Sequence, residues 1–371
     1  MILNNKRITL IISSLTGGGA EGICVSIANN FAKNGWFVDL VVLNLNDEVY
    51  LNRISDNVNL IVLNVNHVRN SFTKLFKYLY TKNVKTVLVF NHELAVTLVI
   101  LRYLFRLKIK IISRNISVLS IKIKQYKIEN LWTRNIIRPL VKYFYKKIDH
   151  VINQSHSMRD DLIDIFPQLN QNSSVINNPI SEQIYNYSNK YDLNKIAKKN
   201  YLLCVGRLEK VKAFHYAIEA FSDIANKSQN LRLKIVGQGS LEGELKQKVK
   251  DCNLESRVDF EGFQKNIIPY YLYAKATILT SLYEGYPNVL IESIAMNTPV
   301  VAFNCPGGTS EIVKNGINGY LVKNKDINDL KNKLSILLSN KYNYEDLRNS
   351  IKENQIQNVF LKYEKLINSF V

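Results

Sequence analysis

The feature that most constrains this chain is a regular alternation of strand-like and helix-like segments along its whole length. The strand candidates are continuous apolar runs rich in Val and Ile, rather than alternating apolar and polar residues. Such runs are typical of parallel strands that helices cover on both faces. In the intervening segment Glu21–Lys33 the apolar residues fall on one helical stripe, and Gly35 follows as a stop signal. The pattern therefore predicts an α/β fold with doubly wound parallel sheets.

The alternation falls into two series. Strands of the first are expected at Ile8–Ser14, Phe37–Leu43, Val58–Leu63, Thr86–Phe90, Ile109–Ser113 and His150–Asn153. Strands of the second are expected at Tyr201–Val205, Leu231–Val236, Val258–Glu261, Ala276–Thr280, Pro299–Phe303 and Gly319–Val322. The stretch from Asn177 to Asn200 is polar and rich in Tyr and Lys, and we interpret it as an inter-domain linker.

We predict a Rossmann-like domain over residues 1–178, a second over 179–354, and a terminal helix, about residues 355–371, that packs back on the first. A chain of 371 residues is long enough for two cores. Because ligands of open α/β sheets bind at the carboxyl ends of the strands, we expect the site in a cleft between the two domains.

Composition narrows the class of protein. Four cysteines lie far apart without metal-ligand spacing, which indicates reduced packing residues in a cytoplasmic protein. The net charge is +18, and thirteen Lys or Arg residues fall between Arg102 and Lys147. A field of that sign attracts polyanions or an anionic membrane surface. A nucleic-acid-binding protein is an alternative that only the charge suggests, because no recognisable nucleic-acid-binding module accompanies it.

Glycine turns follow several expected strands. The first, Thr16 to Glu21, contains Gly17, Gly18 and Gly19, and lets backbone N–H groups at a helix start approach an anion. It lacks the dinucleotide spacing G-x-G-x-x-G, which argues against a nicotinamide oxidoreductase. After the first strand of the second series, Arg207 and Lys212 supply two positive charges of the kind a diphosphate needs. Taken alone, that stretch is better explained as a loop with two solvated bases.

The segment from Ser281 to Glu292 carries the most specific motif. Pro287 suits the first turn of a helix, which places Glu284 on the preceding loop and Glu292 just over one turn after Asn288. The N–H groups of Asn288 and Val289 suit a phosphate, and the two carboxylates suit sugar hydroxyls. Further glycine turns follow at Gly237-Gln238-Gly239 and at Cys305-Pro306-Gly307-Gly308.

Together these pieces resemble the retaining glycosyltransferases of the GT4 group, which have the GT-B fold of two Rossmann-like domains facing across a cleft. The resemblance covers nearly the whole chain, and Glu284 to Glu292, an E-x7-E pattern with Pro and Asn at its centre, is its most specific part. It is strongest for the branch that builds capsule, O-antigen, exopolysaccharide and related bacterial surface glycans.

The resemblance implies a hexose or N-acetylhexosamine transfer from a nucleotide-sugar, with UDP as the expected nucleotide, to a lipid-linked saccharide. Arg207 and Lys212 would hold the diphosphate, Glu292 the ribose and Glu284 the sugar. Gly18, Gly19, Gly237, Gly285, Asn288 and Val289 complete the donor-binding set, of which Glu284, Arg207 and Lys212 are the catalytic candidates. No metal or other cofactor is expected, because a helix N-terminus and basic side chains stabilise the leaving diphosphate. A nucleotide-sugar epimerase or another GT-B enzyme is the alternative.

The chain departs from the family pattern at three places. Gly22 stands where the glycine loop commonly carries Arg, and Ala213 replaces the usual Gly after Lys212. Ser113-Arg114-Asn115 is similar to the branch's Ser-Glu-Arg-Asn element with the glutamate missing, so Arg114 and Asn115 are candidate acceptor or cleft residues. His92 is the nearest replacement for a histidine that many members carry, although a lone histidine is more often a packing residue.

A basic helix is expected from Trp132 to Ile148. Ile137, Leu140, Val141, Phe144 and Ile148 would face the sheet, and Pro139 would kink the helix. A second stripe consists of Arg134, Arg138, Lys142 and Lys146. Either this stripe is a solvated face, or it holds the enzyme on the anionic inner leaflet of the bacterial cytoplasmic membrane, where lipid-linked acceptors lie. We favour the membrane interpretation, and we expect no nucleic-acid partner.

Overall fold

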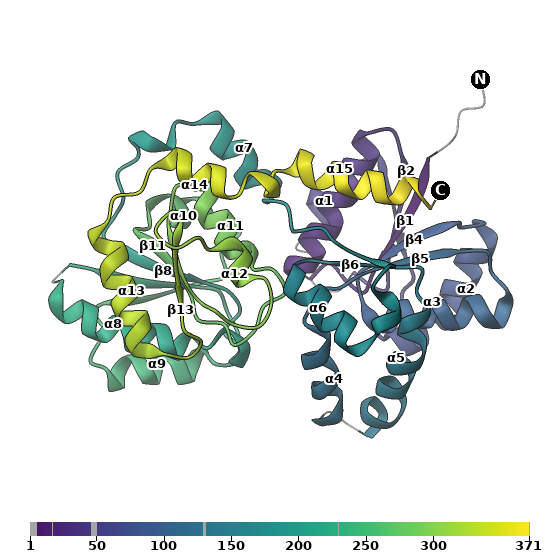
Figure 1. Cartoon of the computed structure of the whole chain (residues 1–371), viewed down its shortest axis with the longest axis horizontal. Helices are drawn as coiled ribbons and strands as arrows, with labels where there is room; N and C mark the ends of the chain where they lie inside the picture. Colours follow the sequence, from purple (N-terminus) through teal and green to yellow (C-terminus); the bar gives the residue numbers. More distant parts are fainter. Residues whose placement is uncertain (1–5, 17, 46–49, 129–130, 229, 371) are drawn as a thin grey trace. The chain divides into compact units, whose positions relative to one another are not determined.

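The computed structural model describes residues 6–16, 18–45, 50–128, 131–228 and 230–370 (Figure 1). The chain divides into an N-terminal unit, Met1–Pro179 with Ile356–Val371, and a C-terminal unit, Ile180–Gln355. Each unit contains one parallel sheet with helices on both faces. The predicted α/β class with two doubly wound sheets is therefore confirmed.

The sheet of the N-terminal unit has the strand order β3-β2-β1-β4-β5-β6-β7. Its strands are β1 (Arg7–Ile12), β2 (Phe37–Val42), β3 (Val58–Val62), β4 (Thr86–Val89), β5 (Lys110–Arg114), β6 (His150–Asn153) and β7 (Ser173–Val175). The helices of this unit are α1 (Gly19–Lys33), α2 (Phe72–Thr81), α3 (His92–Phe105), α4 (Leu119–Ile128), α5 (Arg138–Phe144), α6 (His156–Ile165) and α15 (Ile356–Asn368). Short 3₁₀ turns and one π-helical turn, Thr133–Ile137, connect them.

The sheet of the C-terminal unit has the order β10-β9-β8-β11-β12-β13. Its strands are β8 (Tyr201–Val205), β9 (Arg232–Val236), β10 (Val258–Gly262), β11 (Ala276–Leu279), β12 (Val300–Phe303) and β13 (Gly319–Val322). The helices are α7 (Glu182–Lys190), α8 (Phe214–Lys227), α9 (Glu242–Asp251), α10 (Ile268–Tyr273), α11 (Asn288–Ala295), α12 (Thr309–Ile312), α13 (Ile327–Ser339) and α14 (Tyr344–Ser350). In both sheets the strands are first added on one side of the first strand and then on its other side. This is the Rossmann arrangement, in which ligands bind at the carboxyl edge beside that change of side.

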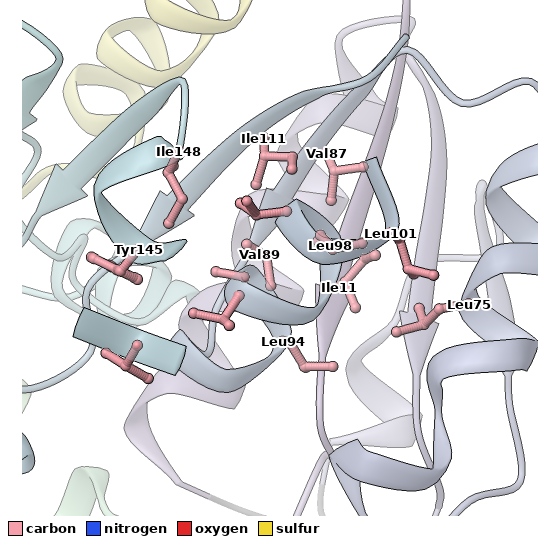
Figure 2. Packing of buried hydrophobic residues seen from close by; sticks show 14 of the residues in the cluster. Ile11, Leu75, Val87, Val89, Leu94, Leu98, Leu101, Ile111, Tyr145 and Ile148 are labelled. Atoms are coloured by element: carbon pink, nitrogen blue, oxygen red, sulfur yellow. The ribbon is translucent and has the colours of Figure 1, made fainter. Parts of the chain in front are cut away.

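The first strand shows why its apolar run is continuous. Ile8, Leu10 and Ile12 contribute to the cluster that contains α1 and α15, whereas Ile11 contributes to the cluster on the opposite face. Figure 2 shows that second cluster, in which residues of α3 such as Leu94 and Leu98 pack beside β1, β4 and β5. A strand buried on both faces needs apolar side chains at successive positions.

The terminal helix α15 belongs to the N-terminal unit and packs against α1 (Figure 1). The rings of Phe31 and Phe360 meet edge to face with centroids 5.1 Å apart. Trp36 also donates a hydrogen bond from Nε1 to Glu364 at 3.1 Å. The helix thus completes the apolar layer on one face of the N-terminal sheet.

The linker prediction for the stretch up to Asn200 is wrong. Within it, α7 and the following turn pack on the C-terminal unit, where Ile184 is 1% exposed and Leu193 is fully buried. Three buried apolar side chains, Ile180, Ile184 and Leu193, were enough to fix the segment. The abundance of polar residues, Tyr and Lys hid them, although Tyr185 and Tyr187 of α7 also pack against this core.

A hydrogen-bonded cluster of polar side chains surrounds Asp39, which lies in β2 of the N-terminal sheet. Its carboxylate accepts hydrogen bonds from Arg7, Asn59 and Tyr78 at 2.7 to 2.8 Å. Burial raises the pKa of Asp39, but these hydrogen bonds outweigh burial and lower the pKa overall. The charged carboxylate is therefore a stabilising part of this sheet.

Candidate functional site

The carboxyl edge of the C-terminal sheet brings several of the predicted residues together. Because all six strands are parallel, the loops after β8, β9, β11 and β12 leave the sheet at one edge. The loops after β8 and β9 touch through their backbones, since Leu208 N donates to Gln238 O at 3.0 Å. Gly237 has a φ of +140°, and a Cβ there would lie 1.9 Å from the carbonyl oxygen of Gly206. Glycine at 237 therefore serves this close approach of the two loops.

Glu284 is ion-paired inside this edge. Its Oε1 accepts hydrogen bonds from Lys212 Nζ and from Ser281 Oγ, each at 2.6 Å. The side chains of Lys212 and Glu284 are 19% and 13% exposed. The structure thus joins two of the three catalytic candidates in one partly buried pair.

The loop that carries Glu284 is fixed to the loop after β12. Glu284 N donates to Pro306 O at 3.0 Å, and Gly308 N donates to Gly285 O at 2.9 Å. A Cβ on Gly307, whose φ is +114°, would lie 1.5 Å from Glu284 O. This close contact between the two loops requires glycine at 307, and it fixes the backbone of the residue that carries the carboxylate.

Helix α11 begins as the sequence predicts, with Pro287 as N-cap and Asn288 as the first helical residue. Asn288 and Val289 contribute the first N–H groups, which lie at the positive end of the helix dipole. Glu292, one turn later, is half-buried and accepts a hydrogen bond from Tyr271 at 3.3 Å. The two glutamates therefore have different partners: a lysine and a serine for Glu284, and a tyrosine for Glu292.

Arg207 is in a different position from Lys212. It is exposed directly after β8, and it forms no ion pair with any residue that the structure describes. The backbone of Lys212 is tied to the loop after β11, since its carbonyl accepts from Thr280 Oγ1 at 3.0 Å, and Ala213 follows with a φ of +46° as the N-cap of α8. The usual glycine at this position would adopt that conformation without strain, which gives a physical reason for the family pattern.

Gly18 and Gly19 belong to the N-terminal unit. Gly18 is the N-cap of α1 and Gly19 its first residue, while Gly17 lies outside the described residues. A Cβ on Gly22, the position where the family commonly carries Arg, would lie 3.1 Å from the hydroxyl of Tyr50. The ring of Tyr50 thus lies close to α1 at Gly22.

His92 and Asn115 lie in a buried hydrogen-bond network. His92 Nε2 lies 3.0 Å from Asn115 Oδ1, and the same oxygen accepts from the hydroxyl of Tyr145. Burial lowers the pKa of His92 to about 4, so the ring is neutral at pH 7. With 5% exposure for His92 and none for Asn115, both are interior residues of the N-terminal unit. The role of His92 and Asn115 as acceptor or cleft residues stays a prediction.

Arg114 is also buried, with 1% of its surface exposed. Its guanidinium donates to the hydroxyl of Tyr363 on α15 and to the side-chain oxygen of Asn178, and it lies over the ring of Phe90. The role of Arg114 as an acceptor or cleft residue likewise stays a prediction. The network joins β5, α15 and the end of the first chain segment within one unit, a set of contacts that residue spacing does not reveal.

The basic stripe predicted for residues 134–146 is interrupted. Arg134, Lys142 and Lys146 are exposed, but Arg138 is half-buried and its Nε is buried without a hydrogen-bond partner. The π-helical turn Thr133–Ile137 widens the helix before Pro139, which breaks the four-residue period of a regular α-helix. The inward-facing residues are as expected, since Val141 and Ile148 are buried and Ile137, Leu140 and Phe144 pack against the core.

Comparison with known proteins assigns the family. Residues 17–183 match the family model Glycosyltransferase Family 4, and residues 188–358 match Glycosyl transferases group 1. The chain is a GT4-type glycosyltransferase. The transferase is 27% identical over 340 residues to an uncharacterized glycosyltransferase of Haemophilus influenzae, with 90% of this chain and 91% of the relative covered.

Two further relatives have described activities. One is the amylovoran biosynthesis glycosyltransferase AmsD of Erwinia amylovora, which is 27% identical over 85% of each chain. The other is an N-acetylgalactosaminyltransferase of Campylobacter jejuni whose acceptor is a diphospho-undecaprenol-linked saccharide. It is 30% identical over 54% of this chain and 53% of its own length. One of these relatives is thus named for polysaccharide biosynthesis and the other for extending an undecaprenol-linked saccharide.

The GT-B fold is confirmed by solved structures. The crystal structure of Anabaena HepE with UDP-glucose has a TM-score of 0.76 to the transferase at 17% identity, covering 98% of this chain and 99% of the other. Across the part of the transferase that the structure describes, none of the helices has both the length and the apolar character to cross a membrane. Nor does any group of three His, Cys, Asp or Glu residues in the same ranges have the geometry of a metal site.

Sequence reasoning missed two residues of the site. Ser281 lies next to the E-x7-E motif, but its hydrogen bond to Glu284 depends on how the loop folds back. Tyr271 comes from α10 and reaches Glu292 from 21 positions away. A serine three residues before the first glutamate was the available signal for Ser281; the sequence offered none for Tyr271.

Proposed function

We propose that this transferase moves a hexose or N-acetylhexosamine from a UDP-sugar to a lipid-linked saccharide in the biosynthesis of a bacterial capsule, O-antigen or exopolysaccharide. Transfer retains the anomeric configuration and needs no metal. The observation that carries the proposal is the Lys212–Glu284 pair at the carboxyl edge of β8 and β11, which joins the turn before α8 to the loop that leads into α11. A cation for the diphosphate and an acid for the sugar thus lie side by side.

We assign the roles as the family resemblance implies. Lys212 and Arg207 neutralise the diphosphate together with the N–H groups of Asn288 and Val289, and Glu292 binds the ribose hydroxyls. Lys212 is anchored and Arg207 is exposed, so Arg207 closes on the phosphate from solvent. The relatives' donors and acceptors support this reading: UDP-glucose is bound in HepE, and the Campylobacter enzyme acts on an undecaprenol-linked acceptor.

In the transfer step the bond between the anomeric carbon and the diphosphate oxygen breaks, and its electron pair leaves with UDP. The acceptor hydroxyl oxygen bonds to the same face of that carbon, and its proton passes to the departing phosphate. The positive charge that develops on the sugar is stabilised by the carboxylate of Glu284, while Lys212 and the start of α11 stabilise the leaving group. In this scheme neither Glu284 nor Glu292 forms a covalent bond.

The N-terminal unit supplies the membrane contact. Four apolar side chains between residues 131 and 143 are 36 to 67% exposed, namely Leu131, Trp132, Ile136 and Tyr143. Beside them, Tyr103 of α3 and Tyr143 both lie against the ammonium of Lys147. A surface hollow of about 580 Å³ lies at the end of α3, lined by Arg102, Arg106, Lys108, Lys110 and Asp149 among others. Exposed rings among bases are typical of a surface that rests on anionic lipid.

Donor screening tests the chemistry. UDP-sugars are ranked by thermal shift, and the best is assayed for transfer to an undecaprenyl-diphosphate-linked saccharide, with the anomeric configuration of the product read by NMR. Glu284→Gln and Arg207→Ala are expected to lose most of the turnover, about 100-fold or more, without unfolding. Wild-type turnover in both variants contradicts the site assignment. Conversion of the UDP-sugar without an acceptor identifies an epimerase instead.

Liposome co-sedimentation tests the membrane contact at low salt. Replacing Arg134, Arg138, Lys142 and Lys146 together by Gln should reduce binding to vesicles that contain phosphatidylglycerol. A matched control removes four exposed lysines of the C-terminal unit, Lys227, Lys250, Lys265 and Lys275. Equal binding by both quadruple variants means that only net charge matters, and unchanged binding by the first excludes the proposed surface.

A further inference from the structure

The two hydrogen bonds that hold Glu284 end on one atom. Lys212 Nζ and Ser281 Oγ both donate to Oε1 of Glu284 at 2.6 Å. Ser281 is fully buried, while the lysine and the glutamate are partly exposed. A diphosphate that binds Lys212 competes with Glu284 for the same ammonium, because a desolvated cation interacts strongly with either anion. The serine hydroxyl has no such competitor.

The backbone around the pair is fixed independently of the ion pair. Thr280 Oγ1 donates to Lys212 O at 3.0 Å, and Leu282 N donates to Val211 O at 2.8 Å. The segment that carries Lys212 is therefore tied to the segment that carries Ser281. The lysine side chain can exchange its partner while both loops stay in place.

We propose that Ser281 is a positioning residue that keeps the Glu284 carboxylate oriented when the donor diphosphate draws Lys212 away. The proposal rests on the proposed function and deepens it. In the empty site Lys212 neutralises Glu284. In the donor complex the Lys212 ammonium binds the diphosphate, and the Ser281 hydroxyl still donates to Oε1 of Glu284. The carboxylate then faces the sugar without a cation that neutralises it.

The exchange of Lys212 between Glu284 and the diphosphate predicts an effect of Glu284 on UDP affinity. If Glu284 competes with the diphosphate for Lys212, neutralising Glu284 frees the lysine. Glu284→Gln should therefore bind UDP more tightly than the wild type, by about threefold to tenfold, although it turns over much more slowly. Lys212→Met should lose UDP affinity.

The test measures UDP affinity by isothermal titration, together with kcat and the donor KM, for the wild type, Ser281→Ala, Ser281→Thr, Glu284→Gln and the Ser281→Ala/Glu284→Gln double variant. Ser281→Ala should lower kcat by about tenfold or more, since it removes a hydrogen bond to a charged group, while UDP affinity and donor KM stay within about twofold. Ser281→Thr, which keeps the hydroxyl, should restore most of kcat. In the Glu284→Gln background the alanine substitution should change kcat less than about twofold.

A matched control comes from α9, where Lys246 and Glu242 form another pair at 2.6 Å. Glu242→Gln should change neither UDP affinity nor turnover. Wild-type kcat in Ser281→Ala, or additive losses in the double variant, would overturn the positioning role while leaving the site assignment intact. Weaker UDP binding by Glu284→Gln would overturn the exchange. Undiminished turnover of Glu284→Gln is a different outcome, because it contradicts the proposed function itself.

Discussion

Lys198 lies just before β8, and its ammonium is buried at the ends of two helices. Nζ donates to Leu272 O in the last turn of α10 at 2.8 Å, to Thr298 Oγ1 at 2.6 Å, and to Met296 O at the end of α11 at 3.4 Å. A cation at helix C-termini is favourable, and three oxygens match its three protons. Burial nevertheless lowers the pKa of Lys198 from 10.5 to about 7.

The sign of the pH effect follows from this lowered pKa. Below pH 7 both the folded and the unfolded states carry the proton, and the cost of burying the charge is fully present. Between about pH 7 and 10.5 the unfolded chain binds more protons than the folded one, so the contribution of Lys198 to stability rises with pH. At roughly 1.4 kcal/mol per pH unit, the full rise amounts to at most about 5 kcal/mol.

The assay is urea unfolding of the wild type and Lys198→Met at pH 6.5, 8 and 9.5. Other titrating groups cancel in the difference between the two proteins, which should shift in favour of the wild type by about 2 kcal/mol or more over this range. Lys198 lies in the C-terminal unit, so unfolding is followed by circular dichroism, which reports on both units. Both tryptophans, Trp36 and Trp132, lie in the N-terminal unit, so their fluorescence should report the same transition in the wild type and the variant. A difference that stays constant within about 0.5 kcal/mol across this pH range refutes the reasoning.

Three further predictions concern stability. Gly307→Ala should lower the free energy of unfolding by about 2 kcal/mol or more and reduce turnover, because the new Cβ would lie 1.5 Å from a carbonyl oxygen. The assay is thermal denaturation, and the matched control is Gly316→Ala, which is also at positive φ but has open space around its Cβ. Asp39→Asn should remove a contribution that is present above the ordinary aspartate pKa of 3.8 and is lost as the pH falls below it, so the variant should show a flatter loss of stability between pH 5 and 3. Tyr363→Phe should cost about 2 kcal/mol by removing an acceptor from buried Arg114, and an unchanged melting temperature would show that this hydrogen bond adds nothing.

The sequence by itself determined the strands of both sheets except β7, Ser173–Val175, and most of the donor motif. Continuous apolar runs fixed the strands, because a parallel strand buried on both faces admits little else. Glycine at 237 and 307 was recognisable as a turn, and the E-x7-E motif placed Glu284 before a helix that begins at Asn288, as the structure confirms. Strands, turns and helix starts are local properties, because residues that are close in the sequence determine them.

Only the tertiary structure decided which polar groups meet. Arg114 ends β5 and His92 follows β4 at the carboxyl edge of the sheet, yet both are interior residues, where Arg114 donates to the hydroxyl of Tyr363 and His92 pairs with Asn115. The segment 180–200 became part of a core through a few apolar side chains. The pairing of Glu284 with Lys212 and Ser281 depends on loops from different strands. Arg114 and Tyr363 are 249 positions apart, and a side chain's partner at such a distance follows from packing, which residue spacing does not encode.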